Sequence, residues 1–204
     1  SSAASDVYKR QIVSYPPMIS KGANSSALIQ YVDFVPTLLE MIGIDSTQIT
    51  TGNTDSTGYT GFDGKDFLGV LKGQHSAHRE HVYSQLTAIG LAGNQFSYPM
   101  RAVRDSRFKF IRNLASGNQF TIKGIHQSPL LQTWIADAKS DAKLSARIDH
   151  LYQRPEEELY DLWLDPYEKR NLAAHSSMQG EKSRLSNILD QWMKQQGDKG
   201  VISE

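Results

Sequence analysis

The side chains best suited to catalysis or anion binding lie in the segment FSYPMRAVRDSRFKFIRN, which spans residues 96 to 113. Ser97 carries a hydroxyl that can act as a nucleophile, and Arg101 carries a planar guanidinium that binds carboxylates and sulfates through paired hydrogen bonds. Successive side chains of a strand point to opposite faces, so Arg101 and Arg104 cannot belong to one basic patch. One interpretation places Arg101 in a substrate cleft. The other is a solvated sheet face with ordinary surface ion pairs.

Two further clusters contain side chains of the kinds that ligate metal ions. His75, His78 and His81 are spaced three residues apart, but their segment passes from loop to strand and gives them no common helical face. The three glutamates at 156–158 precede a strand, whereas calcium needs six or more converging oxygens. We therefore predict exposed or hydrogen-bonded histidines, a solvated acidic surface and no metal site.

The composition excludes several classes of function. Lys and Arg together number 22, and so do Asp and Glu, which gives a formal net charge of zero and argues against nucleic-acid binding. No apolar run approaches the roughly 20 residues that span a bilayer, and no signal peptide is visible, so no membrane partner is expected. The chain has no Cys, which rules out disulfides and thiolate metal sites within it.

Hydrophobic periodicity predicts an antiparallel sheet with helices on one side. Four short runs have the character of strands, at residues 81–86, 99–105, 107–113 and 157–164. A helix over 34–43 is predicted by one apolar stripe, made of Val35, Leu38, Leu39 and Ile42. Further helices are expected over 128–150 and 179–196. The last of these carries a stripe that should cover the apolar face of the sheet, made of Leu185, Ile188, Leu189 and Trp192.

Local patterns add three more specific predictions. Phe108 and Phe110 alternate with basic residues, which is typical of a sheet with one face in water. The step at 105–106 suits a tight hairpin between two of the strands. Asp165 and Glu168 fit the first and last positions of a capping box, with a proline between them, and so predict the start of a helix.

The first eleven residues, SSAASDVYKRQ, join abruptly to the rest of the chain. They show no periodic pattern of apolar residues, and they resemble the in-frame translation of a transposase adapter used to prepare metagenomic sequencing libraries. The alternative is a natural polar tail. Under the adapter interpretation residues 1–11 are not native, and the genuine coding sequence was cut at Ile12, so the chain is expected to be a C-terminal fragment of a longer protein.

Four segments together resemble the sulfatase family, which is part of the alkaline-phosphatase-like superfamily. They are YVDFVPTLLEMIGI, DGKDFLGVLKG followed by REHVYSQ, YPMRAVRDSRFKFIRNL, and ELYDLWLDPYEKRNLA. The segment around Tyr98 and the helical insertion before ELYD most resemble heparan N-sulfatase (sulfamidase) and its bacterial relatives. The resemblance implies an α/β fragment in which residues 12–75 end an alkaline-phosphatase-like catalytic domain. Residues 76–204 then form an α+β subdomain with a roughly four-stranded antiparallel sheet packed by a C-terminal helix.

The resemblance also implies a reaction and the residues that perform it. Sulfatases hydrolyse sulfate esters or sulfamates of sulfated carbohydrates, with a formylglycine nucleophile and a bound calcium ion in the full-length protein. The matching positions lie upstream of this chain, which therefore lacks the nucleophile and the metal ligands and is expected to bind no cofactor. Ser97 has the outline of the maturation motif, but Met100 stands at its fourth position and strand residues follow it, so Ser97 is predicted to be non-catalytic.

The loop before Arg101 resembles one that helps to close the substrate pocket in this family. Thr87, Asn94 and Arg101 are the implied substrate-binding residues, although the loop lacks the histidines of the mammalian heparan N-sulfatases. The isolated fragment is expected to be inactive. It is also expected to be poorly soluble, because the missing N-terminal catalytic domain would leave the stripe of 34–43 uncovered.

Two alternatives stay open at this point. One is a phosphatase or phosphodiesterase of the same superfamily, and the other is a non-catalytic carbohydrate-binding module with an aromatic platform. The family resemblance alone implies a periplasmic or extracellular location for the parent protein.

Overall fold

The computed structural model describes residues 12–19, 21–50, 61–86, 98–121 and 126–200. The predictions made for residues 1–11 and for Ser97, Thr87 and Asn94 lie outside these ranges.

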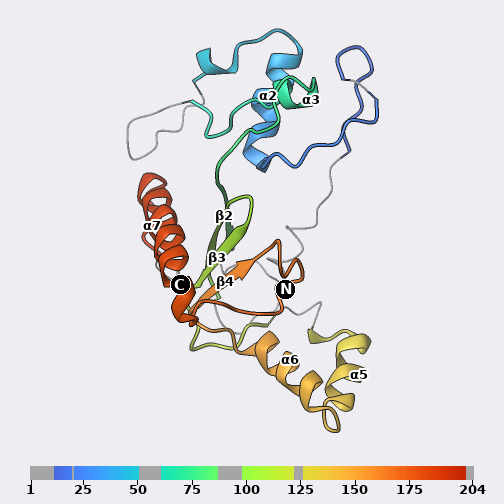
Figure 1. The fold of residues 1–204 in the computed structure, drawn as a ribbon. Coiled ribbons are helices and arrows are strands. Elements are labelled where there is room, and N and C mark those ends of the chain that lie inside the picture. The colour runs from blue at the N-terminus through green and yellow to red at the C-terminus, as the bar shows by residue number, and fades with distance from the viewer. Residues whose placement is uncertain (1–11, 20, 51–60, 87–97, 122–125, 201–204) are drawn as a thin grey trace.

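A four-stranded antiparallel sheet is the centre of the fold (Figure 1). Its strands are β1 (Val82–Leu86), β2 (Met100–Arg104), β3 (Phe108–Asn113) and β4 (Glu157–Asp161), in the order β1-β2-β3-β4. The β2–β3 hairpin closes at Asp105, whose backbone N–H donates to the carbonyl of Phe108 at 3.0 Å. The predicted sheet, its strands and its hairpin are thus confirmed.

Helix α7 (Gln179–Gln195) lies against one face of the sheet (Figure 1). Leu185, Leu189 and Met193 of the helix are buried in a cluster to which the sheet contributes Val103 and Phe110. The predicted stripe is confirmed, and its apolar contacts join the C-terminus of the chain to the sheet.

Loop residues cover the opposite face of the sheet, so the prediction of a wet face was wrong. Ala102, Ile111 and Tyr160 form a second buried cluster there, and Lys109 is only 4% exposed. The cause is a tertiary contact: Glu168, from the loop after β4, reaches across this face and pairs with Lys109.

The predicted helix start at Asp165 was also wrong. The segment from 165 to 168 is a turn, in which the Glu168 backbone N–H donates to the Asp165 carbonyl at 3.1 Å. Glu168 has a φ of 53°, in the left-handed region that non-glycine residues seldom adopt. Its ion pair with Lys109 stabilises this conformation and replaces the capping box.

A helical hairpin between β3 and β4 confirms the prediction for 128–150. It consists of α5 (Pro129–Asp137), capped by Ser128, and α6 (Ala142–Tyr152), capped by Asp141. The hairpin extends from the end of the sheet away from the N-terminal helices (Figure 1).

The N-terminal elements precede the sheet in sequence. They are η1 (Tyr31–Asp33), α2 (Phe34–Met41), η2 (Ser46–Gln48) and α3 (Leu68–Leu71), and a further short helix, η3 (Ser176–Met178), leads into α7. The α2 stripe is exposed, with Val35 51%, Leu38 57% and Ile42 71% accessible. Among the described residues, no helix is long and apolar enough to cross a membrane.

Candidate functional site

Arg101 is the one predicted substrate-binding residue that lies within the described ranges. Its side chain is buried, and its Nε and Nη2 donate to the carboxylate of Asp198, the latter at 3.2 Å. Its Nη1 donates to the carbonyls of Leu86 at 3.1 Å and Met100 at 3.0 Å. Arg101 therefore joins the end of β1, the start of β2 and the C-terminal segment.

The Arg101 guanidinium also stabilises the negative charge of its partner, Asp198. Its hydrogen bonds hold the pKa of Asp198 below the ordinary value, against the opposing effect of burial. Arg101 lies on the α7 face of the sheet and Arg104 on the other, as the alternation predicted. Arg101 as a substrate ligand stays a prediction, as do Thr87 and Asn94.

A large hollow borders the sheet on the side of the N-terminal segments. Its volume is about 2660 Å³, and residues of 12–32, 62–76 and the β1–β2 pair line it. Pockets for small ligands typically enclose roughly 300 to 1,000 Å³. The hollow is therefore larger than a typical pocket for one small molecule. Arg101 is not among its lining residues.

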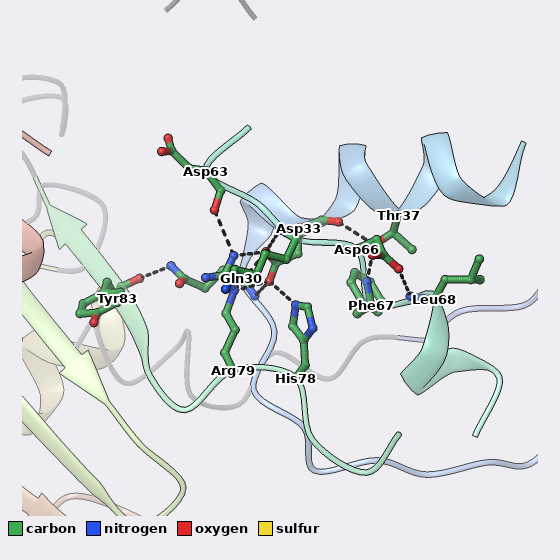
Figure 2. A network of polar contacts seen from close by, with 11 residues as sticks. Gln30, Asp33, Thr37, Asp63, Asp66, Phe67, Leu68, His78, Arg79 and Tyr83 are labelled. Carbon is green, nitrogen blue, oxygen red and sulfur yellow. Dashed lines mark hydrogen bonds and ion pairs between the residues drawn. The ribbon is translucent and has the colours of Figure 1, made fainter. Parts of the chain in front are cut away.

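A buried carboxylate, Asp33, is the centre of the polar cluster in Figure 2. Its Oδ2 accepts from the backbone N–H of Gln30 at 2.8 Å and lies 3.2 Å from Nε2 of His78. Its Oδ1 accepts from the backbone N–H of Lys65 at 3.0 Å, and the Arg79 guanidinium pairs with both oxygens. The prediction of a hydrogen-bonded histidine is confirmed for His78.

Burial and hydrogen bonding act on Asp33 in opposite directions. Burial would raise the pKa of this carboxyl, but the hydrogen bonds from Arg79 and from two backbone N–H groups, with the charge of Arg79, hold the pKa below its ordinary value. Asp33 is thus a paired anion. Its two oxygens already have five donors, so it has no free oxygen for general-base chemistry.

The same cluster connects the N-terminal helices to the sheet. The Thr37 hydroxyl donates to the Asp33 carbonyl at 2.6 Å and accepts from the Phe67 backbone N–H at 3.0 Å. The Gln30 side chain donates to the carbonyl of Tyr83 in β1 at 3.0 Å. We infer that the Asp33 cluster positions α2 against the strand that follows it. Its members are up to 53 residues apart in the sequence, so no local sequence pattern reveals it.

A second buried carboxylate, Glu158, corrects the prediction of a solvated acidic surface at 156–158. Glu158 has no exposed surface, and Arg154 donates to both of its oxygens at 2.8 Å. Asn113 donates to it at 2.7 Å, and the Tyr160 hydroxyl is a fourth donor. The sequence signal that was available is alternation, because Glu157 and Glu158 must face opposite sides of β4.

The described residues offer no site for a metal ion. No group of three or more His, Asp or Glu side chains converges within the part of the chain that the structure describes. The buried carboxylates have arginine, histidine and backbone partners, and the arrangement supports positioning of the fold more than it supports catalysis.

Comparisons with known proteins connect the chain to one group of enzymes. No family model matches the chain. An ulvan-active sulfatase of Formosa agariphila is 30% identical over 193 residues, which are 95% of this chain and 34% of that protein. The human N-sulphoglucosamine sulphohydrolase is 24% identical over 191 residues, which are 89% of this chain and 35% of that protein. The chain thus spans about a third of the length of these relatives.

Solved structures show a similar fold. A protein in complex with its substrate D-glucosamine-2-N,6-O-disulfate superposes with a TM-score of 0.57 and 20% identity. The match covers 91% of this chain and 28% of that protein.

Proposed function

We propose that this chain, whose homologues are sulfatases, is the C-terminal portion of a hydrolase that removes sulfate groups from sulfated glycans. The observation that carries the proposal is the match of 193 residues at 30% identity to an ulvan-active sulfatase. The match runs through almost the whole chain, so it covers the N-terminal helices as well as the sheet.

The substrate class follows from the names of the relatives. One acts on ulvan, one on N-sulphoglucosamine, and one structural neighbour was solved with a disulfated glucosamine. Two of the names include an N-linked sulfate, and one of those two also includes an O-linked sulfate. We therefore propose a sulfated glycan as the substrate and include both sulfate esters and sulfamates.

The catalytic groups of the parent belong to residues outside this chain in our proposal. Formylglycine would supply the nucleophile and calcium would stabilise charge on the sulfate. Within the described ranges no group of acidic and histidine side chains fits a calcium ion, so no step of the reaction is assigned to these residues.

In this proposal, the role of this chain in the parent protein is to position the rest of the protein and the substrate loop. The exposed α2 stripe and the large hollow provide surfaces on which the remaining two thirds of a sulfatase would pack. The Arg101 pair with Asp198 joins the end of β1 and the start of β2 to the C-terminal segment. In this proposal Thr87 and Asn94, which lie between those two strands in the sequence, contact the sugar.

The test compares this chain with its full-length parent, recovered by sequencing the source DNA upstream of Ile12. We expect the parent to hydrolyse an aryl sulfate and to lose activity with a calcium chelator, and this chain alone to show no turnover. Hydrolysis of an aryl phosphate but not of the sulfate would support the phosphatase alternative instead. Turnover by the isolated chain would show that its own residues form a catalytic centre.

A further inference from the structure

We propose that the loop after β4 carries a binding site for a sulfated sugar, formed by Trp163, Leu164 and Tyr167 beside a small pocket that Arg107 and Arg170 line. We call it the 163–170 surface. The choice of a sulfated sugar as ligand rests on the proposed function, whereas the aromatic and basic groups are properties of this chain.

Three large apolar side chains lie exposed within five residues of this loop. Trp163 is 67% exposed, Leu164 81% and Tyr167 71%. Large exposed apolar side chains that lie close together usually mark an interaction site. Aromatic rings are suited to sugars, because the C–H groups on one side of a sugar ring pack flat on them.

The loop that carries these side chains is fixed by buried and half-buried partners. Asp161 accepts from the backbone N–H groups of Trp163 at 3.1 Å and Leu164 at 3.3 Å. The indole N–H of Trp163 donates to the carbonyl of Ser106 at 3.0 Å. The Trp163 ring is therefore held in place before any ligand binds, which reduces the entropy lost on binding.

Two arginines supply positive charge beside the rings. Arg107 pairs with Asp161 through Nε at 3.0 Å and Nη2 at 2.7 Å, and its guanidinium lies 5.3 Å from the Trp163 ring. Its Nη1 makes no hydrogen bond with the described residues. Arg170 is exposed, and its guanidinium makes no hydrogen bond or ion pair with the other described residues. Both arginines therefore keep N–H donors available for an anion.

A small pocket lies between these arginines and the start of α7. It encloses about 220 Å³, and its lining includes Arg107, Arg170, His175 and Ser177. This volume is below the roughly 300 to 1,000 Å³ of pockets for drug-sized ligands, so it suits one sulfate group and not a whole sugar. His175 Nδ1 lies 3.1 Å from the Ser177 hydroxyl, which leaves its Nε2 available.

Two carboxylates in the pocket lining already have partners. Asp161 is paired with Arg107, and Asp165 accepts from the backbone N–H of Arg170 at 2.7 Å. The lining therefore contains two arginines and two carboxylates, and the cationic N–H donors that remain for an anion belong to Arg107 and Arg170. A sulfate in the pocket would place the attached sugar ring at the mouth, where Trp163 and Leu164 are exposed.

Calorimetry on the full chain tests this site with a heparin-derived tetrasaccharide, its desulfated counterpart and inorganic sulfate. We expect the sulfated tetrasaccharide to bind and the desulfated one to bind at least about tenfold more weakly, because charge-assisted hydrogen bonds are lost. Arg170→Gln and Trp163→Ala should each weaken binding about tenfold. Trp134→Ala and Lys143→Gln, an exposed tryptophan and a lysine of the α5–α6 hairpin, are the matched controls and should change nothing.

Several results would overturn the site. They are equal affinity for the desulfated sugar, equal loss in the two control variants, or no binding by protein that circular dichroism shows to be folded. Self-association of the chain that Trp163→Ala abolishes would assign the surface to a second copy instead. Binding requires no turnover, so a negative result here leaves the proposed function standing. An inactive parent, in turn, leaves this result unaffected.

Discussion

Replacement of Glu158 by glutamine provides the most direct test of how this fold is held together. Glu158 is fully buried, and the guanidinium of Arg154, whose side chain is 5% exposed, is its main partner. Glutamine keeps the shape of the side chain but removes the negative charge. Arg154 then stays in the interior as a cation without a counter-ion.

The expected loss of stability follows from that geometry. Removal of one partner of a buried ion pair costs about 3 to 5 kcal/mol, because the remaining charge stays desolvated. With a urea m-value of roughly 1 to 3 kcal/mol/M, this corresponds to a fall of about 1 to 5 M in the unfolding midpoint. The total stability of a domain is only about 5 to 15 kcal/mol, so the variant should be close to unfolding.

Glu157→Gln is the matched control on the neighbouring residue of β4. Glu157 pairs with Lys182 at 2.9 Å, but their side chains are 31% and 24% exposed. Partly exposed pairs of this kind contribute about 0 to 1 kcal/mol. Urea unfolding of both variants, followed by circular dichroism, should separate them clearly. Equal midpoints for the two variants would refute the assignment of Glu158 as a buried anion on which the fold depends.

The pH dependence gives a second check on the same residue. Burial would raise the pKa of Glu158, but the hydrogen bonds and charge of Arg154 hold it below the ordinary value of 4.5. Because the folded-state pKa is depressed, the stability from this group is present above about pH 4.5 and is lost as the pH falls through the folded-state pKa. The difference between the native chain and Glu158→Gln should therefore shrink in acid. A constant difference down to pH 3 would contradict it.

Two further predictions concern the N-terminal part of the chain. A Cβ on Gly64 would lie 1.8 Å from the Val32 carbonyl oxygen, so Gly64→Ala should displace the Asp33 cluster and cost about 1 to 3 kcal/mol. Hydrogen exchange in α2 should increase in this variant and stay unchanged in Gly117→Ala, where a Cβ meets open space. Leu38→Ser on the exposed α2 stripe should reduce dye binding and self-association of the isolated chain, measured by ANS fluorescence and light scattering. Equal reduction by Leu130→Ser, an exposed leucine of α5, would argue against the stripe as the cause.

The order of strands and helices was predictable because it depends on local periodicity. The stripe of α7 and the alternation in β3 are visible in one sequence, since each repeats within a single element. Burial of Lys109 was not predictable, because its partner Glu168 lies outside β3. For Glu158, alternation predicts that Glu157 and Glu158 face opposite sides of β4, but it does not show which of the two is buried with Arg154. A charged residue in a strand is predicted to face solvent unless a buried partner for its charge is known.

The false helix at Asp165 has the same physical origin. Its capping signals are local and weak, each worth about 1 kcal/mol, whereas Glu168 makes a buried ion pair with Lys109. Alternation along β2 correctly predicted that Arg101 and Arg104 lie on opposite faces. No local pattern indicated Asp198, which follows Arg101 by 97 residues and pairs with its guanidinium.

The α2 stripe and the 163–170 surface differ in chemistry, so they are suited to different partners. The α2 stripe consists of Val35, Leu38 and Ile42, which are aliphatic and bring no hydrogen-bond donors of their own. Such a surface gains free energy only by leaving water, so the interior of a protein suits it best. The 163–170 surface instead combines a fixed aromatic ring with arginine N–H groups, which need a partner that is both flat and anionic. Packing of the parent's remaining domain should therefore cover the α2 stripe and leave the 163–170 surface open to a sulfated sugar.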